Sequence, residues 1–154
     1  MAGVDQFILL RHARAGRKLS NPRKDFERGL DAKGKDVAMR LPRTIESYLR
    51  PEAILSSPFL RCVQTVQPLA DELDLPISKD DRFTPGRTEA SVRQAFLSIP
   101  ANSVVSTHGE VIAHLFDERV KCAKGAFWLV ERRDDQLLPA HYVEAPARQQ
   151  RPAR

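Results

Sequence analysis

The chain has 154 residues, of which 42% are hydrophobic and 29% charged, and its formal net charge is +5 at pH 7. These values are ordinary for a globular protein and predict a single domain with a substantial core. No apolar stretch is long enough to cross a membrane, and Asp5 and Gln6 interrupt the pattern of a secretory signal, so we expect a cytoplasmic protein.

The positive charge favours anionic partners in general. Lysines and arginines are spread along the chain, and the sequence has neither an aromatic RNA-binding motif nor zinc-finger spacing, so we do not expect nucleic acid as the partner. Charge-driven binding of DNA or RNA stays open as an alternative. Phosphorylated proteins and phosphate-bearing small molecules fit the charge as well. Much of the excess lies in residues 147–154, which we expect to form a solvated, disordered tail.

Strands and helices are predicted to alternate from the N-terminus. Residues 4–10 form a short apolar run typical of a buried strand, whereas the polar residues 15–26 predict a loop. Asp31 is a candidate N-cap for a helix that contains Pro42, which we expect to kink it. Residues 53–56 predict a second buried strand. Ser57 and Pro58 open the next helix, with Pro58 near its first position and Ser57 as its cap.

The second half of the chain continues this alternation and then changes. Residues 76–78 predict a short third strand, and Thr88 caps the helix that follows. Residues 103–107 predict a central strand from their β-branched content, with a helix starting at His108 and Gly109. Residues 126–132 and 136–143 then predict a hairpin. The pattern predicts a three-layer α/β/α sandwich with a mostly parallel central sheet and a C-terminal β-hairpin, in one domain over residues 1–146.

Four basic side chains follow strands of this predicted sheet. Ligands of open α/β sheets bind beyond the carboxyl ends of the strands, where Arg11, His12 and His108 fall, with Arg61 within one helical turn. A neutral imidazole can attack phosphorus, and the planar guanidinium group of arginine can donate two hydrogen bonds to phosphoryl oxygens. A cationic second histidine can donate to the oxygens as charge develops, and Gly109 opens a helix whose N-terminus favours anions. We therefore expect neither a metal ion nor a cofactor.

Cys62 and Cys122 are the two cysteines of the chain. They form no metal-ligand cluster and no CxxC motif, so we expect reduced, buried or half-buried thiols, with a redox role as the alternative.

These residues resemble the histidine phosphatase superfamily. Its signature has an Arg-His-Gly or Arg-His-Ala motif after the first strand, which matches Arg11-His12-Ala13. It continues with a Ser-x-x-x-Arg-(Cys/Ala)-x-x-Thr helix start, matched by residues 57–65, and with a late His-Gly, matched by His108-Gly109. The resemblance implies a phosphoglycerate mutase-like fold. It also implies that His12 is the phosphorylated nucleophile and that Arg11, Arg61 and His108 form the phosphate pocket.

Within the superfamily the chain resembles the compact, SixA-like branch. Phosphoglycerate mutases have a long insertion between the middle arginine and the second histidine, and here that interval holds one short strand and one helix. An open site suits a phosphohistidine on another protein, or a small phosphorylated compound. Residues 107–112 also resemble the phosphatase domain attached to Nudix domains in some actinobacterial enzymes, so a nucleotide or small phosphomonoester is the alternative substrate. A non-catalytic phospho-ligand binding module is a further alternative.

The acid that protonates the leaving group is harder to assign. Members of the superfamily that cleave phosphate esters use a Glu or Asp after the third strand, and Glu89 is the candidate by position. Glu89 lies at a helix N-terminus, which stabilises the carboxylate and lowers its pKa, whereas an acid needs a raised pKa. Glu89 as an ordinary residue of the first helical turn, without a catalytic role, therefore stays open. Asp81 and Glu110 are alternatives. A phosphoramidate needs less acid assistance, so this uncertain assignment favours cleavage of a P–N bond.

Overall fold

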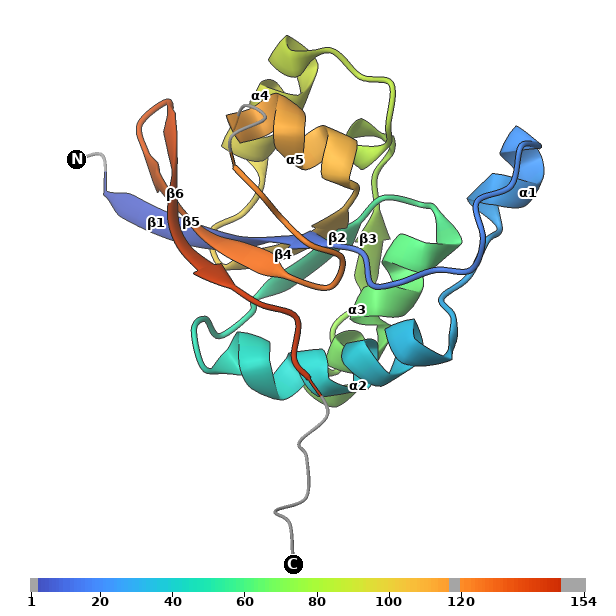
Figure 1. Ribbon diagram of the computed structural model, residues 1–154. Helices are drawn as coiled ribbons and strands as arrows, with labels where there is room; N and C mark the ends of the chain where they lie inside the picture. Colours follow the sequence, from blue (N-terminus) through green and yellow to red (C-terminus); the bar gives the residue numbers. More distant parts are fainter. Residues whose placement is uncertain (1–2, 117–119, 148–154) are drawn as a thin grey trace, which may run out of the picture.

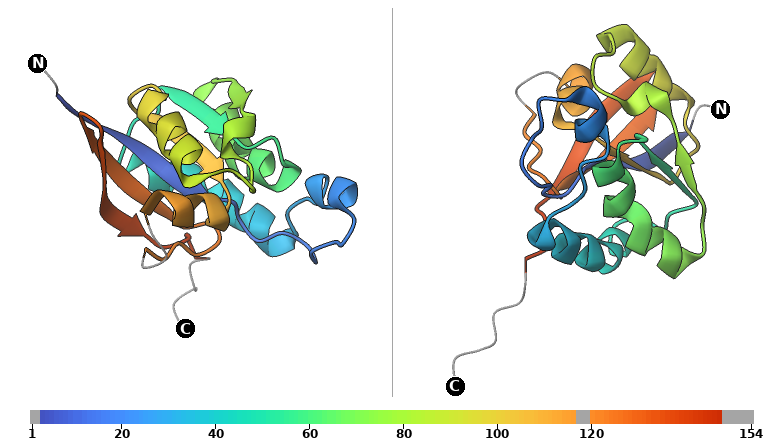
Figure 2. Two further views of the ribbon diagram at one scale, coloured as in Figure 1. Left: turned by 90° about the horizontal axis from the view of Figure 1, so that it is seen from above. Right: turned by 90° about the vertical axis from the view of Figure 1, so that its right-hand side faces the viewer.

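A six-stranded mixed sheet crosses the molecule, with helices on both faces (Figures 1 and 2). The computed structural model describes residues 3–116 and 120–147. The strand order is β3-β2-β4-β1-β5-β6. The first four of these strands are mutually parallel, whereas β5 and β6 continue the sheet antiparallel to β1. In chain order the strands are β1 (Val4–Arg11), β2 (Ala53–Ser56), β3 (Ile77–Lys79), β4 (Ser103–Thr107), β5 (Phe127–Arg133) and β6 (Gln136–Val143).

The side-chain alternation of β1 builds two cores, one on each face of the sheet. Phe7 and Leu9 belong to the core beneath α4 (Glu89–Ser98) and α5 (Gly109–Phe116). Ile8 and Leu10 point to the opposite face, which packs against α2 (Ala32–Glu46) and α3 (Leu60–Leu73). Figure 1 shows these helix pairs above and below the sheet. The predicted α/β/α sandwich of the phosphoglycerate mutase type, with a mostly parallel sheet and a C-terminal hairpin, is therefore confirmed.

Two of the predicted helix caps are present. The side chain of Asp31 accepts a hydrogen bond from the Gly34 amide at 2.8 Å, and Thr88 accepts one from the Ser91 amide at 3.1 Å. These contacts satisfy amides that the first turn of a helix leaves without partners. Pro42 lies inside α2, and the helix continues beyond it to Glu46.

The segment between β1 and α2 differs from the prediction of a plain loop. It contains a short helix, α1 (Pro22–Phe26), because Asn21 accepts hydrogen bonds from the Arg23 and Lys24 amides and Pro22 occupies the first helical turn. Figure 1 shows α1 set apart from the sheet on long connections.

A second difference concerns the start of α3. This helix begins at Leu60, and Phe59 is its N-cap residue, with no side-chain cap hydrogen bond. Ser57 and Pro58 therefore precede the helix. The hydroxyl of Ser57 makes a different contact, described below.

The C-terminal hairpin agrees with the prediction, with Asp134 in the left-handed region (φ 55°) at its turn. A short 3₁₀ turn (Asp81–Phe83) follows β3. Residues 148–154, most of the predicted tail, lie outside the described residues. Over residues 3–116 and 120–147, none of the helices combines the length and apolar character that a membrane crossing needs.

Candidate active site

His12 follows the last residue of β1 and is held against the neighbouring strand. Its amide donates to the Thr107 carbonyl at the end of β4 (3.0 Å). The Nδ1 atom of its ring lies 2.8 Å from the Ala13 carbonyl oxygen, which can only accept a hydrogen bond. Nδ1 therefore carries the ring proton, and the lone pair resides on Nε2. This is the tautomer that a nucleophilic histidine needs.

His108 follows β4 and brings a second imidazole to the same place. The two ring centroids are 5.5 Å apart and the ring planes are inclined by 67°. Burial, with the nearby charges of Arg61 and Arg11, lowers the pKa of His12 to about 4. Burial, with His12 and Arg61, lowers the pKa of His108 to about 3. Both rings are neutral near pH 7 in the free protein. His108 would therefore gain a proton, and its positive charge, only when an anion binds beside it.

Two guanidinium groups reach the same site from different elements. Arg11 ends β1 and Arg61 lies in the first turn of α3. The Nη1 atom of Arg11 donates to the Cys122 carbonyl at 2.9 Å, which fixes its orientation. The Nε atoms of both arginines are buried and have no hydrogen-bond partner among the described residues. Unpaired buried donors cost free energy, and because both arginines line the same cavity, they indicate a site for an anion.

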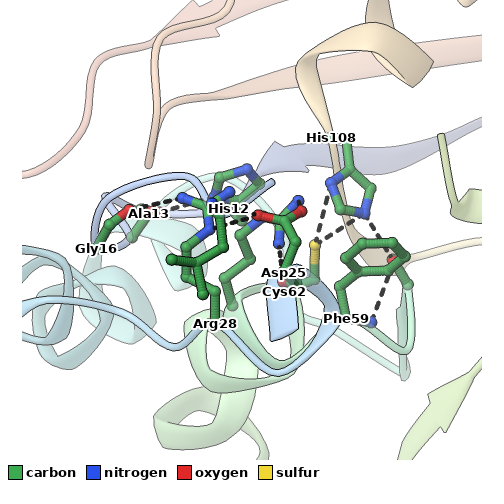
Figure 3. Close-up of polar contacts among 11 residues, drawn as sticks. His12, Ala13, Gly16, Asp25, Arg28, Phe59, Cys62 and His108 are labelled. Atoms are coloured by element: carbon green, nitrogen blue, oxygen red, sulfur yellow. Dashed lines mark hydrogen bonds and ion pairs between the residues drawn. The ribbon is translucent and has the colours of Figure 1, made fainter. Parts of the chain in front are cut away.

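Asp25 of α1 contacts the Arg61 guanidinium. Figure 3 shows Asp25 and Arg28 next to each other in this network. The Nη1 atom of Arg61 donates to the Asp25 carbonyl oxygen at 2.9 Å, and its Nη2 lies 3.5 Å from the Asp25 carboxylate. Asp25 also pairs with Arg28 at 2.9 Å, and Arg28 donates to the Gly16 carbonyl at 2.7 Å. This network was not predicted, since the polar residues 15–26 indicate a loop. The i,i+3 spacing of Asp25 and Arg28 was the available signal.

His108 is positioned by residues that precede α3 or lie in its first turn. The Ser57 hydroxyl lies 2.8 Å from His108 Nε2, and the Cys62 sulfur lies 3.5 Å from the same atom. The ring of Phe59 meets His108 edge to face at 4.8 Å. Ser57 therefore orients the imidazole and does not cap α3, which corrects the prediction. Cys62 is fully buried, and burial raises its thiol pKa to about 12, in keeping with the expected inert thiol.

The four basic side chains line one cavity of about 430 Å³. Gly109 lies in its wall, and a Cβ atom at this position would come within 2.9 Å of the Arg11 guanidinium carbon. The close approach explains why glycine suits this position. The remaining lining residues are Lys18, Pro85, Glu110, Ile112, Val120 and Cys122.

Glu89 is not among the residues that line this cavity. Its side chain is 80% exposed and lies 3.9 Å from His114, on the outer face of the first turn of α4. The structure thus brings Arg11, His12, Arg61, His108 and Gly109 together and leaves Glu89 apart, because a position in the sequence does not fix which face of a helix a residue takes. Asp81, in the 3₁₀ turn, does not line the cavity either, whereas Glu110 does. Within the described ranges, no three His, Cys, Asp or Glu side chains cluster as a metal site would require.

Comparison with known proteins identifies related sequences. The family model of the histidine phosphatase superfamily (branch 1) matches residues 7–85. An 8-oxo-(d)GTP phosphatase from Mycolicibacterium smegmatis is 30% identical over 90% of this chain and 48% of its own length. The chain therefore spans about half the length of this curated relative.

Solved structures share the fold at lower identity. The protein histidine phosphatase SixA in complex with tungstate superposes with a TM-score of 0.70 at 21% identity, over 87% of this chain and 96% of the other. A SixA protein from Nakamurella multipartitia gives a TM-score of 0.75 at 19% identity, over 95% and 99% of the two chains. One from Agrobacterium tumefaciens gives 0.66 at 22%, over 89% and 99%.

Proposed function

Since the chain belongs to the histidine phosphatase superfamily, we propose that it is a phosphatase that takes up the phosphoryl group on His12 as a covalent phosphohistidine. The observation that carries the proposal is that one cavity is lined by His12, whose Nε2 has the lone pair, and by two arginines whose buried Nε–H groups have no partner among the described residues. The proposed catalytic unit is the domain over residues 1–146.

In the first half-reaction, His12 Nε2 attacks the phosphorus atom, and the bond from phosphorus to the leaving group breaks. The Ala13 carbonyl holds the proton on Nδ1 and stabilises the positive charge that develops on the ring. Water then attacks the phosphohistidine, phosphate leaves, and the neutral imidazole is restored.

Arg11, Arg61 and His108 stabilise the transferring group. The two arginines line the cavity, and their guanidinium N–H groups donate to the oxygens of this group. The negative charge of the bound phosphoryl group favours protonation of His108, which then donates to an equatorial oxygen, and the Ser57 hydroxyl 2.8 Å from His108 Nε2 holds the ring in place. Removing one such donor slows comparable reactions by about 10²–10³. The protein donors supply the neutralising charge in this scheme without a metal ion.

For the substrate, we propose a phosphohistidine on another protein or a small phosphorylated compound. The likeness in fold to SixA phosphohistidine phosphatases, one of them bound to the tetrahedral oxyanion tungstate, supports this choice. A nucleotide is the second candidate, favoured by the 30% identity to an 8-oxo-(d)GTP phosphatase.

The test is hydrolysis of p-nitrophenyl phosphate in EDTA by the wild-type chain and by His12→Ala. We expect turnover by the wild type and a loss of at least 10³-fold in the variant. A labelled phosphoryl group should be recovered on the wild-type protein as an acid-labile, base-stable adduct. Equal turnover by the two proteins would refute the proposal, and tungstate binding without turnover of esters or phosphoramidates would identify a non-catalytic binding module.

A further inference from the structure

The proposed reaction needs a proton acceptor for the attacking water, and the cavity offers a carboxylate for that task. Among the described residues that line it, Glu110 is the one acidic side chain, and it shares the cavity with His12 and His108. Glu89, the candidate by sequence position, is 80% exposed outside the cavity. A general base must stand within hydrogen-bond reach of the proton that it removes, so location decides between the two.

One of the two carboxylate oxygens of Glu110, an exposed side chain, has a backbone hydrogen-bond partner. Oε2 accepts a hydrogen bond of 2.7 Å from the Gly86 amide, next to Pro85 in the cavity wall. Glu110 also lies in the first turn of α5, where the helix dipole stabilises a negative charge. A carboxylate anchored at one oxygen keeps the lone pairs of the other for a water molecule in the cavity.

We infer that Glu110 is the general base that activates water for hydrolysis of the phosphohistidine on His12. Water gives one proton to the carboxylate, its oxygen forms a bond to phosphorus, and the bond from phosphorus to Nε2 breaks. The electron pair of that bond returns to the ring, which is then neutral with its proton on Nδ1. The products are inorganic phosphate and a protonated Glu110.

The carboxyl then releases its proton to solvent, which restores the carboxylate for the next turnover. This inference depends on the proposed phosphohistidine intermediate. It gives the role of general base to Glu110 of α5, two residues after His108, in place of Glu89 on α4.

Glu110→Gln separates the chemical role from a structural one. The amide oxygen of glutamine can still accept from Gly86, so the cavity wall keeps its hydrogen bond, but the amide cannot take a proton from water. With p-nitrophenyl phosphate, whose leaving group departs without an acid, formation of the phosphoenzyme should stay fast and its hydrolysis should slow. We expect a burst of one equivalent of nitrophenolate per enzyme, followed by turnover reduced about 10²–10³-fold.

Three matched proteins complete the experiment. Glu110→Asp keeps a carboxylate and should recover part of the rate, and the exposed Glu144→Gln should behave as the wild type. Thermal unfolding of each variant shows that it is folded. A burst from Glu89→Gln, or turnover by Glu110→Gln within about twofold of the wild type, would overturn the assignment. Turnover that His12→Ala does not reduce would instead refute the phosphohistidine itself.

Discussion

The ring of His108 stands edge to face against that of His12, with 5.5 Å between the centroids, although 95 residues of chain separate the two. Parallel pairing of β1 with β4 produces this contact, because Arg11 and Thr107 are register partners and a histidine follows each strand within one residue. Burial, and after it the neighbouring His12, lowers the pKa of His108, so the pair stays neutral in the free protein.

This pair predicts that the protein loses stability on mild acidification. The pKa values of His12 and His108 are lowered to about 4 and about 3 in the folded protein, against about 6.5 in the unfolded chain. Between pH 6.5 and 4 the unfolded state therefore binds more protons. Stability is complete above pH 6.5 and decreases below it, by up to about 1.4 kcal/mol per pH unit for each histidine.

Urea unfolding over this pH range measures the slope. Carboxylates contribute as well, so the informative quantity is the difference between the wild type and His12→Gln. We expect a shallower decrease of the unfolding free energy in the variant. Parallel curves for the two proteins would contradict the lowered pKa of His12.

Gly109→Ala should damage anion binding more than folding. The new Cβ atom would lie 2.9 Å from the Arg11 guanidinium carbon, which is the mobile end of a long side chain. Arg11 can shift at little cost to stability, but its Nε–H then leaves the anion site. We expect the Kd for tungstate to rise about 10- to 100-fold, with the melting temperature within about 4 °C of the wild type.

Titration calorimetry with tungstate checks this expectation. Gly3→Ala is the control, because a Cβ atom there meets nothing within 4 Å. Unchanged affinity in Gly109→Ala would show that Arg11 does not contact the oxyanion.

Ser57→Ala should lower kcat and leave KM nearly unchanged. The hydroxyl is 2.8 Å from His108 Nε2 and fixes the ring that acts when charge develops on the phosphoryl group. Arg11 and Arg61 still bind the substrate in the ground state. We expect kcat to fall about tenfold, the equivalent of one hydrogen bond, and KM to change less than about twofold. Ser57→Thr keeps the hydroxyl and should recover most of the rate, whereas a change in KM alone would contradict the assigned role.

The sequence predicts the sheet and the meeting of the basic groups because these depend on short-range patterns. The apolar run of β1 and the β-branched residues of β4 each predict a strand. Parallel strands then place His12 and His108 together at the carboxyl-terminal edge of the sheet. The hydrophobic period did not identify α1, whose helix has no buried residue and depends on the Asn21 cap.

Contacts between distant segments could not be predicted in the same way. The carbonyl of Cys122 that orients Arg11 belongs to backbone, so no residue type signals it. Ser57 reads as a helix cap from its neighbours in sequence, and its contact with His108 emerges only once β2 and β4 pair side by side. Glu89 and Glu110 both occupy the first turn of a helix, and only the packing of the helices distinguishes which one faces the cavity.

Asp25→Asn should destabilise the free protein and strengthen its binding of oxyanions. The Arg61 side chain is only 7% exposed, and Asp25 supplies its nearby negative charge at 3.5 Å. Without that charge the folded protein contains a buried cation lacking its counter-ion, at a cost of about 1–3 kcal/mol. A bound phosphate or tungstate replaces the missing charge, so the bound state loses less stability than the free state does.

Thermal unfolding with and without tungstate separates the two effects. We expect a lower melting temperature for free Asp25→Asn and a larger increase on adding tungstate than in the wild type, because the Kd falls about tenfold. Inorganic phosphate, the reaction product, should then inhibit the variant more strongly. Weaker tungstate binding by the variant would contradict this expectation. It would show that the Asp25 carboxylate helps binding by holding Arg61 in position more than it hinders binding by repelling the oxyanion. Arg40→Gln, which breaks an exposed ion pair with Asp36 on α2, is the control and should change neither quantity.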